Sequence, residues 1–382
     1  MEGDHIRINN GLLPLSWIYG LAVRFRNYLF DIGVLKSRSF DVPVIAVGNL
    51  TVGGTGKTPH VEYLIRLLQD RVKVAVLSRG YKRKTKGYLL ANGQSTATEL
   101  GDEPYQMKSK FPHVSVAVCK KRVEGINRLT TDDKALDVVL LDDAFQHRYV
   151  KPGINILLVD YHRLIIYDKL LPAGRLREPL SGKDRADIVI VTKCPKELKP
   201  MEFRVITKAM NLYPYQQLFF TTFIYKPLQH VFMTEGNDTP QLESLASQHI
   251  LLLTGIASPR QMLADIESAT GQSPATLTFP DHHHFRKKDI ERINQTFIAM
   301  PQPRIIITTE KDAVRLKDAD GLSDDVRRHL YALPLHVAFM LEQGQLFDDK
   351  ILGYVQKNAR NSILVRKREE QRTTSRSNII RF

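Results

Sequence analysis

Short apolar runs rich in β-branched residues alternate along the chain with segments of helical spacing. The first run, 43–47, is continuously apolar, as expected for a strand buried on both faces. Residues 60–69 carry apolar side chains three and four positions apart, which predicts a helix. Strands that alternate with helices at this spacing indicate a doubly wound parallel α/β sheet. Further strands are predicted at 72–77, 114–118, 136–141, 154–159 and 188–192.

The same alternation restarts after residue 218, which predicts a second, smaller α/β domain. Its strands are expected at 219–224, 250–253, 276–279, 304–308 and 335–340, with helices at 259–266 and 287–300. We therefore divide the chain into an N-terminal membrane-interface helix (1–36), a P-loop domain (37–218), a second α/β domain with linker strands (219–345), and a C-terminal helix with a basic tail (346–382).

The N-terminal segment 12–35 is rich in leucine and aromatic residues and contains Arg24 and Arg26. Its uncharged run is shorter than the roughly 20 apolar residues that a membrane span requires. Two interpretations remain. The segment is either a helix in the membrane interface, with its arginines at anionic headgroups, or a core helix packed on the sheet.

Composition and charge narrow the class of protein only partly. A chain of 382 residues with 43% hydrophobic content is long enough for two cores. A net charge of +14 indicates anionic partners, which could be phosphates, acidic lipids or nucleic acid. Two separate cysteines, Cys119 and Cys194, exclude a disulfide framework or a zinc site and fit a reducing cytoplasm.

The loop after the first predicted strand has the composition of a phosphate-binding loop. Its glycines allow successive backbone N–H groups to surround an oxyanion, and the following helix adds partial positive charge. Lys57 would reach the β- and γ-phosphates, and Thr58 would place its hydroxyl on Mg²⁺. Thr51 stands where the usual pattern has glycine, and an ordinary glycine-rich turn is the alternative. We expect nucleotide contacts from Thr51, Val52, Gly53, Gly54, Thr55, Gly56, Lys57 and Thr58.

Two further clusters carry candidate chemistry. Asp142 and Asp143 follow an apolar strand, and Mg²⁺ prefers one or two carboxylates beside phosphate and water oxygens, so either aspartate would supply a metal ligand. The alternative is an acidic turn. Residues 282–284 are three consecutive histidines, whose adjacent side chains point in different directions and do not match metal-ligand spacing. A single histidine that handles a proton is the better hypothesis.

Seven motifs in this order resemble the tetraacyldisaccharide 4'-kinase family: VGNLTVGGTGKT, LSRGY, GDEP, LDDAFQHR, LPAGRLREP, DHHHF and TTEKDAV. Ala144 and Arg175 depart from the family's usual glycine and proline. The resemblance implies two α/β/α domains with the active site between them, ATP, Mg²⁺ and an acylated glucosamine disaccharide phosphate as lipid substrate. It also implies transfer of the γ-phosphoryl group to the 4'-hydroxyl, and a peripheral or monotopic place at the cytoplasmic face of the bacterial inner membrane.

The resemblance further suggests roles for individual residues. Asp102 and His282 would together take the proton of the sugar hydroxyl, with His283 as the fallback; the alternative is that Asp102 only caps its helix. The expected catalytic set is completed by Lys57, Asp142 and Asp143. Contacts to ATP or to the substrate's phosphate are expected from Arg79, Arg122, Arg148 and Arg177, and the resemblance favours Arg177 most.

Two other classes of protein compete with a kinase. A membrane-associated P-loop switch NTPase is the main alternative, although Val52 stands where such proteins often carry lysine. A GTP-specific switch would also need an aspartate that 192–195 lacks. A nucleic-acid-binding ATPase rests on net charge alone, so we expect no nucleic acid partner.

Overall fold

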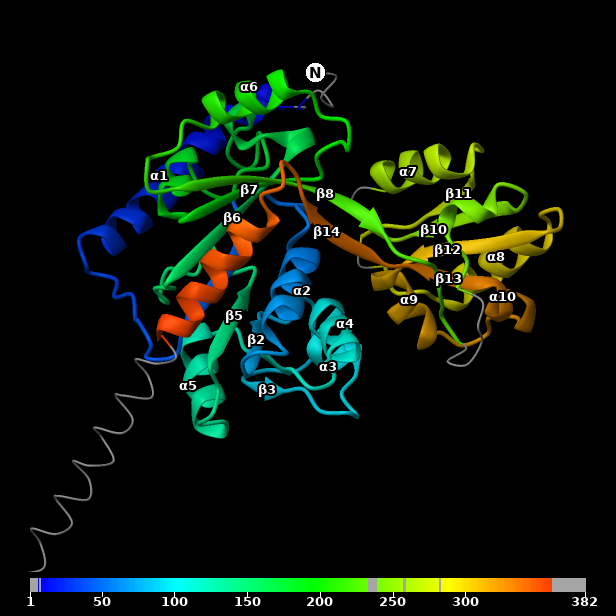
Figure 1. Ribbon diagram of the computed structural model, residues 1–382, viewed down its shortest axis with the longest axis horizontal. Coiled ribbons are helices and arrows are strands. Elements are labelled where there is room, and N and C mark those ends of the chain that lie inside the picture. The colour runs from blue at the N-terminus through cyan, green and yellow to red at the C-terminus, as the bar shows by residue number, and fades with distance from the viewer. Residues whose placement is uncertain (1–5, 7, 233–238, 257–258, 282, 359–382) are drawn as a thin grey trace, which may run out of the picture.

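The computed structural model describes residues 6, 8–232, 239–256, 259–281 and 283–358. Figure 1 shows a larger part built on one sheet and a smaller part built on another, joined by two long strands. Each sheet carries helices on both faces. The predicted doubly wound α/β architecture with a second, smaller α/β unit is therefore confirmed.

The larger sheet has nine strands in the order β14-β8-β7-β6-β1-β5-β2-β4-β3. Its strands are parallel except at the two edges, where β3 runs antiparallel to β4 and β14 antiparallel to β8. The central strands are buried on both faces, which is why their sequences are apolar runs rather than alternating patterns. The bounds are β1 Val44–Asn49, β2 Val74–Ser78, β3 Leu89–Leu90, β4 Ser115–Val118, β5 Val138–Asp142, β6 Ile154–Asp160, β7 Ile188–Thr192, β8 Gln217–Tyr225 and β14 Leu335–Phe339.

Successive side chains of each strand enter opposite cores. In β1, Ile45 and Val47 pack against α2 and α4, whereas Val44 and Ala46 pack on the side of α5. The helix at 344–358 covers the first face together with α2, and α6 covers the second face together with α5. The bounds are α2 Lys57–Leu68, α3 Ala97–Leu100, α4 Asp102–Lys110, α5 Arg122–Asp132 and α6 Pro200–Met210.

The smaller sheet has the order β11-β10-β12-β13-β9 and is parallel except for β9. Helix α7 packs on one face, and α8, α9 and α10 pack on the other. The bounds are β9 Gln229–His230, β10 His249–Thr254, β11 Ala275–Thr278, β12 Arg304–Thr309, β13 Leu330–Leu333, α7 Arg260–Thr270, α8 Lys287–Ile298, α9 Glu310–Lys317 and α10 Asp324–His329.

Strands β8 and β14 connect the two parts. Both belong to the larger sheet by their hydrogen bonds, and they pair antiparallel from Leu335 opposite Tyr225 to Phe339 opposite Thr221. Figure 1 shows them running side by side from the larger to the smaller part. The stretch 219–345 therefore supplies strands to both sheets.

The N-terminal helix α1, Leu13–Asp31, lies on the outside of the larger part. Only Ser16, Gly20 and Phe30 of this helix are buried. Ser16 is fixed at the 168–178 segment, where its hydroxyl bonds to Leu170 and Ala173. The helix thus contacts the protein mainly through small and polar positions. Within the described ranges, no helix is long and apolar enough to cross a membrane.

Candidate active site

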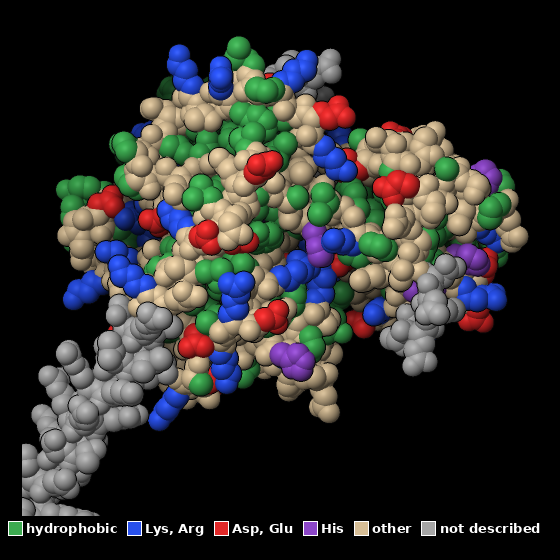
Figure 2. Space-filling view, in the orientation of Figure 1, with side chains coloured by type: hydrophobic (Ala, Val, Ile, Leu, Met, Phe, Trp, Pro, Cys, Tyr) green, Lys and Arg blue, Asp and Glu red, His purple; other side chains and the backbone are tan. Residues whose placement is uncertain are grey.

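A cavity of about 910 Å³ lies where the larger and smaller parts meet. The glycine-rich loop at 51–58, called the phosphate loop below, forms one wall. Segments of α4, β8, α7 and α9 form the others. Figure 2 shows Lys, Arg and His side chains gathered at this junction. All eight residues predicted to contact nucleotide line the cavity: Thr51, Val52, Gly53, Gly54, Thr55, Gly56, Lys57 and Thr58.

The phosphate loop uses glycine where its backbone requires it. Gly53 and Gly56 have φ angles of +115° and +81°, and a Cβ on Gly56 would lie 2.9 Å from the ring of Phe223. Thr51, which replaces the usual glycine, does not have positive φ and instead forms a β-bridge with Leu176. The departure from the usual pattern is therefore accommodated by extended backbone at that position.

Side chains from β6 and β7 hold the loop in place. The Thr192 hydroxyl donates a hydrogen bond of 3.0 Å to the carbonyl of Thr55. Lys193 donates to the carbonyl of Gly54 and pairs with Asp160 at 2.7 Å. The ends of β6 and β7 thus support the phosphate loop, and Lys193 does so from a position that the sequence did not single out.

Lys57, Asp143 and Arg177 form a charged group at the start of α2. The Lys57 ammonium lies 3.7 Å from Asp143, and the Arg177 guanidinium lies 3.0 Å from the same carboxylate. Arg177 also donates to the backbone and side chain of Asn49 at the end of β1. Burial alone would raise the pKa of Asp143, but Lys57 and Arg177 outweigh it and lower that pKa to about 2.

Asp142 lies next to this group but in a different environment. Its Oδ2 accepts a hydrogen bond of 2.9 Å from Ser78, whereas its buried Oδ1 has no hydrogen-bond partner among the described residues. Burial, with the negative charges of Glu103 and Asp143, raises the pKa of Asp142 to about 7. A buried, unpartnered carboxylate oxygen beside other carboxylates is the environment that a divalent cation would stabilise.

The described part of the chain holds no cluster of three or more His, Cys, Asp or Glu side chains that could bind a metal by themselves. Mg²⁺ at kinase sites is held by one or two carboxylates together with phosphate and water oxygens. Asp142 would supply one such carboxylate, and the Thr58 hydroxyl at the first turn of α2 would supply a further oxygen. Asp143 is already engaged by two cations.

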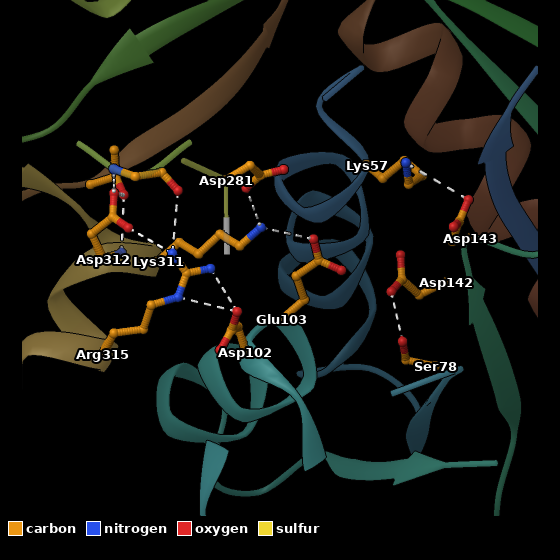
Figure 3. Close-up of polar contacts among 12 residues, drawn as sticks. Lys57, Ser78, Asp102, Glu103, Asp142, Asp143, Asp281, Lys311, Asp312 and Arg315 are labelled. Atoms are coloured by element: carbon orange, nitrogen blue, oxygen red, sulfur yellow. Dashed lines mark hydrogen bonds and ion pairs between the residues drawn. The ribbon is translucent and has the colours of Figure 1, made fainter. Parts of the chain in front are cut away.

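Asp102 and Glu103 open α4, and Glu103 lines the cavity. Asp102 does not cap this helix with its side chain, because the N-cap position is Gly101 and no side-chain cap is formed. Its carboxylate instead receives hydrogen bonds from Arg315 of α9, and Glu103 pairs with Lys311 of α9 at 3.5 Å. Figure 3 shows these four side chains pointing toward one another between the two parts.

The predicted catalytic His282 lies outside the described residues. Its neighbour His283 lies 2.9 Å from Asp289 and stacks on Phe279, with ring centroids 4.9 Å apart. Asp289 is in the first turn of α8 and accepts from the backbone of Arg286. His283 therefore supports the start of α8.

The other predicted substrate arginines occupy three different environments. Arg79 is exposed just after β2. Arg122 is only 2% exposed and donates to the carbonyls of Cys119 and Asp142, so it is part of the packing beneath the site. The positive charges of Arg122 and Arg79 contribute, after burial, to lowering the pKa of His147 to about 4.

Arg148 contacts the N-terminal helix. It donates to the carbonyl of Asn27 and pairs with Asp31 at 2.6 Å, and its guanidinium lies 5.0 Å from the ring centroid of Phe30. Neither Arg148 nor Arg122 lines the cavity, whereas Arg177 does. The structure thus brings together Lys57, Asp143 and Arg177 of the predicted residues, and uses Arg148 to fix α1.

Comparisons with known proteins agree with the motifs. The sequence profile of the family described as tetraacyldisaccharide-1-P 4'-kinase matches residues 8–356. A tetraacyldisaccharide 4'-kinase of Phocaeicola vulgatus is 56% identical over 365 residues, covering 95% of this chain and 99% of the relative. One from Bacteroides thetaiotaomicron is 53% identical, covering 95% and 97%. A crystal structure of LpxK from Aquifex aeolicus in complex with ATP is similar with a TM-score of 0.69 at 32% identity, covering 90% of this chain and 98% of that one.

Proposed function

The chain belongs to the tetraacyldisaccharide-1-P 4'-kinase family, and from this premise we propose how its residues carry out phosphoryl transfer. The protein is an ATP-dependent kinase that phosphorylates the 4'-hydroxyl of a tetraacyldisaccharide 1-phosphate in lipid A biosynthesis. One observation carries the proposed roles. The phosphate loop with Lys57 and the acidic start of α4 face a single cavity to which both parts of the molecule contribute.

The phosphate loop binds the ATP triphosphate in this proposal. Its backbone N–H groups surround the phosphates, and Lys57 exchanges its contact with Asp143 for the γ-phosphate. Asp142 and Thr58 would hold Mg²⁺, which would neutralise charge on the transferred group. Arg177, in contact with Asp143 and Asn49, keeps a second cation beside the same phosphates.

The acceptor hydroxyl must lose its proton as the new bond to phosphorus forms. We propose that Asp102 takes part in this step, because it directly precedes Glu103, which lines the cavity, and belongs to the part of the molecule that carries the phosphate loop. His282 is its proposed partner on sequence grounds alone. Arg79, exposed at the end of β2, is proposed to contact an anionic group of the lipid.

The transfer reaction itself provides the direct test of function. ATP carrying a radiolabelled γ-phosphate should label a tetraacyldisaccharide 1-phosphate in a time-dependent reaction, with little ADP formed when the lipid is omitted. A switch NTPase would show the opposite pattern, with label released as phosphate and none in the lipid. That result would contradict the assigned activity.

We also propose that α1 binds a membrane surface. Five large apolar side chains of this helix are between 56% and 74% exposed, an arrangement that the contacts within the protein do not explain: Trp17, Ile18, Leu21, Phe25 and Tyr28. The core-helix alternative requires such side chains to face the sheet. An amphipathic helix in the interface of an anionic bilayer, with Arg24 beside its apolar face, fits the exposure better.

The triple substitution Trp17→Gln, Leu21→Gln and Phe25→Gln should weaken binding to vesicles that contain phosphatidylglycerol by roughly 10²-fold or more, because three large apolar side chains no longer enter the interface. Cosedimentation with vesicles measures this loss. The contacts of Ser16 and Asn27 with the protein remain, so the thermal unfolding temperature should change little.

Ile298 provides a matched control, because it is 63% exposed on the smaller part. Ile298→Gln should leave vesicle binding unchanged. Equal binding by the triple variant and the unaltered protein would contradict the proposed role of α1.

A further inference from the structure

The TTEKDAV motif at 308–314 has no role in the mechanism described so far. In the structure it forms the end of β12 and the start of α9, and two of its charged side chains reach the larger part. Glu310 pairs with Lys110 of α4 at 2.6 Å, and Lys311 pairs with Glu103. The motif thus docks the smaller part onto α4, the helix that carries Asp102.

Arg315, one turn into α9, makes the most buried of these contacts. Its side chain is 5% exposed, and that of Asp102 is 13% exposed. Nε and one terminal nitrogen of Arg315 donate to Oδ2 of Asp102, at 3.2 and 2.6 Å. Hydrogen bonds between charged groups with little exposure are among the stronger polar contacts in proteins.

The guanidinium of Arg315 is itself fixed from the side of the smaller part. Its other terminal nitrogen donates to Asp312 at 2.8 Å and to the carbonyl of Gly255 at 3.3 Å. Asp312 is fully buried, and its second oxygen accepts from Thr309 and from the backbone of Gly255. One edge of a rigid, planar group is therefore held by the smaller part, and another edge is presented to Asp102.

We propose that Arg315 is a positioning residue for phosphoryl transfer, which orients the Asp102 carboxylate and makes this orientation depend on the approach of the two parts. The proposal rests on the catalytic role assigned to Asp102 above. Two nitrogens of a guanidinium that Asp312 and Gly255 hold in place converge on Oδ2 of Asp102, and this restrains the position of the carboxylate. A carboxylate that must meet a hydroxyl proton benefits from such fixed geometry.

A purely structural role for the pair makes different predictions. If Arg315 only joined the two parts, its loss would lower stability or substrate affinity, and its effect would add to that of Asp102. If Arg315 acts through Asp102, its loss lowers kcat and has little further effect once the carboxylate is gone. Steady-state kinetics of single and double variants separates these accounts.

The experiment compares Arg315→Gln, Arg315→Lys, Asp102→Asn and the double variant Arg315→Gln/Asp102→Asn in the full-length protein. We expect Arg315→Gln to lower kcat about 10²-fold with the KM for ATP within about threefold, because misplacement of a reacting group costs this much. Arg315→Lys should recover part of the rate, since lysine keeps the charge but not the planar fork. The double variant should be within about threefold of Asp102→Asn.

Arg304→Gln is the matched control. Arg304 also pairs with an aspartate, Asp325, at 2.9 Å, but entirely within the smaller part. The Arg304→Gln variant should have a lower unfolding temperature and an unchanged kcat. If Arg315→Gln fails to fold, Arg315→Lys still tests the proposal. A kcat of Arg315→Lys within twofold of that of the unaltered protein would overturn it.

Other outcomes identify which idea is at fault. The role of Arg315 would be overturned if the fold losses in kcat of the two single variants multiplied in the double variant. A rise in KM for Arg315→Gln with kcat unchanged would overturn it as well. A nearly normal kcat for Asp102→Asn would instead remove Asp102 from catalysis, and with it the proposal that rests on it. An inactive Asp102→Asn beside a normal Arg315→Gln would contradict the positioning role alone.

Discussion

Replacing Lys57 by alanine should lower kcat by about 10³-fold or more while the protein remains folded. The ammonium group lies at the first turn of α2, lines the cavity and pairs with Asp143 at 3.7 Å. Removing it deletes a charge directed at the phosphates rather than a packing group. Asp143 keeps its contact with Arg177, so the variant does not leave an unpaired carboxylate.

Lys73→Ala is the appropriate control for this variant. Lys73 also pairs with an aspartate, Asp133, at 2.8 Å, but it lies at the opposite end of β2 from the site. The kcat of Lys73→Ala should equal that of the unaltered protein within experimental error. Turnover by Lys57→Ala close to that of the Lys73→Ala control would exclude the phosphate loop from the mechanism.

The larger sheet could be predicted from the sequence because its physical cause is local. Strands buried on both faces must be apolar along their whole length, and β7 was predicted with the bounds that it has, at 188–192. Short strands were missed: β3, β9 and β13 have two to four residues and carry no pattern of their own. The pairing of 335–339 with β8 was also not predictable, because the local sequence pattern of a strand does not indicate which sheet it joins.

The position of the glycine-rich loop at the cavity was predictable for a similar reason. Glycines, a lysine and a threonine at fixed spacing have one common use, and all eight residues of the loop line the cavity. Arginines carry no such signal, because the same side chain serves phosphate binding, helix docking and core packing. Arg148 and Arg122 were predicted for the substrate, but the structure uses Arg148 to hold α1 and Arg122 to bond backbone carbonyls.

Contacts between the two parts of the chain were the least predictable. Arg315 and Lys311 reach α4 across more than 200 positions of sequence, a separation at which no periodicity operates. The only signal was the density of charge in TTEKDAV beside apolar β12, since charged residues at a strand end usually serve a ligand or a partner. Asp102 and His282 are also far apart in the sequence, at 180 positions, and their partnership came from the family resemblance.

Asp102→Ala and His282→Ala should each lower kcat by roughly 10²–10⁴-fold, and the double variant should be little worse than either single one. The reason is that a carboxylate and an imidazole that move one proton act as a unit, so loss of either removes the function of both. Measurement of kcat at saturating ATP and lipid for the three variants tests this. His283→Ala, which removes a contact with Asp289, tests the fallback assignment: kcat should stay unchanged if His282 is the histidine of the pair.

The competing account of Asp102 is stabilisation of α4, and the structure restricts it. Gly101 holds the N-cap position, so within α4 this aspartate contributes through the helix dipole, on the order of 0.3–1 kcal/mol, and its other stabilising contact is the ion pair with Arg315. Asp324 occupies the same first position in α10 and is exposed, so Asp324→Ala measures that contribution alone. If Asp102→Ala lowers the unfolding temperature as Asp324→Ala does and retains kcat, helix stabilisation explains Asp102. A loss of kcat in Asp102→Ala, with Asp324→Ala unaffected, would instead assign the carboxylate to the chemistry.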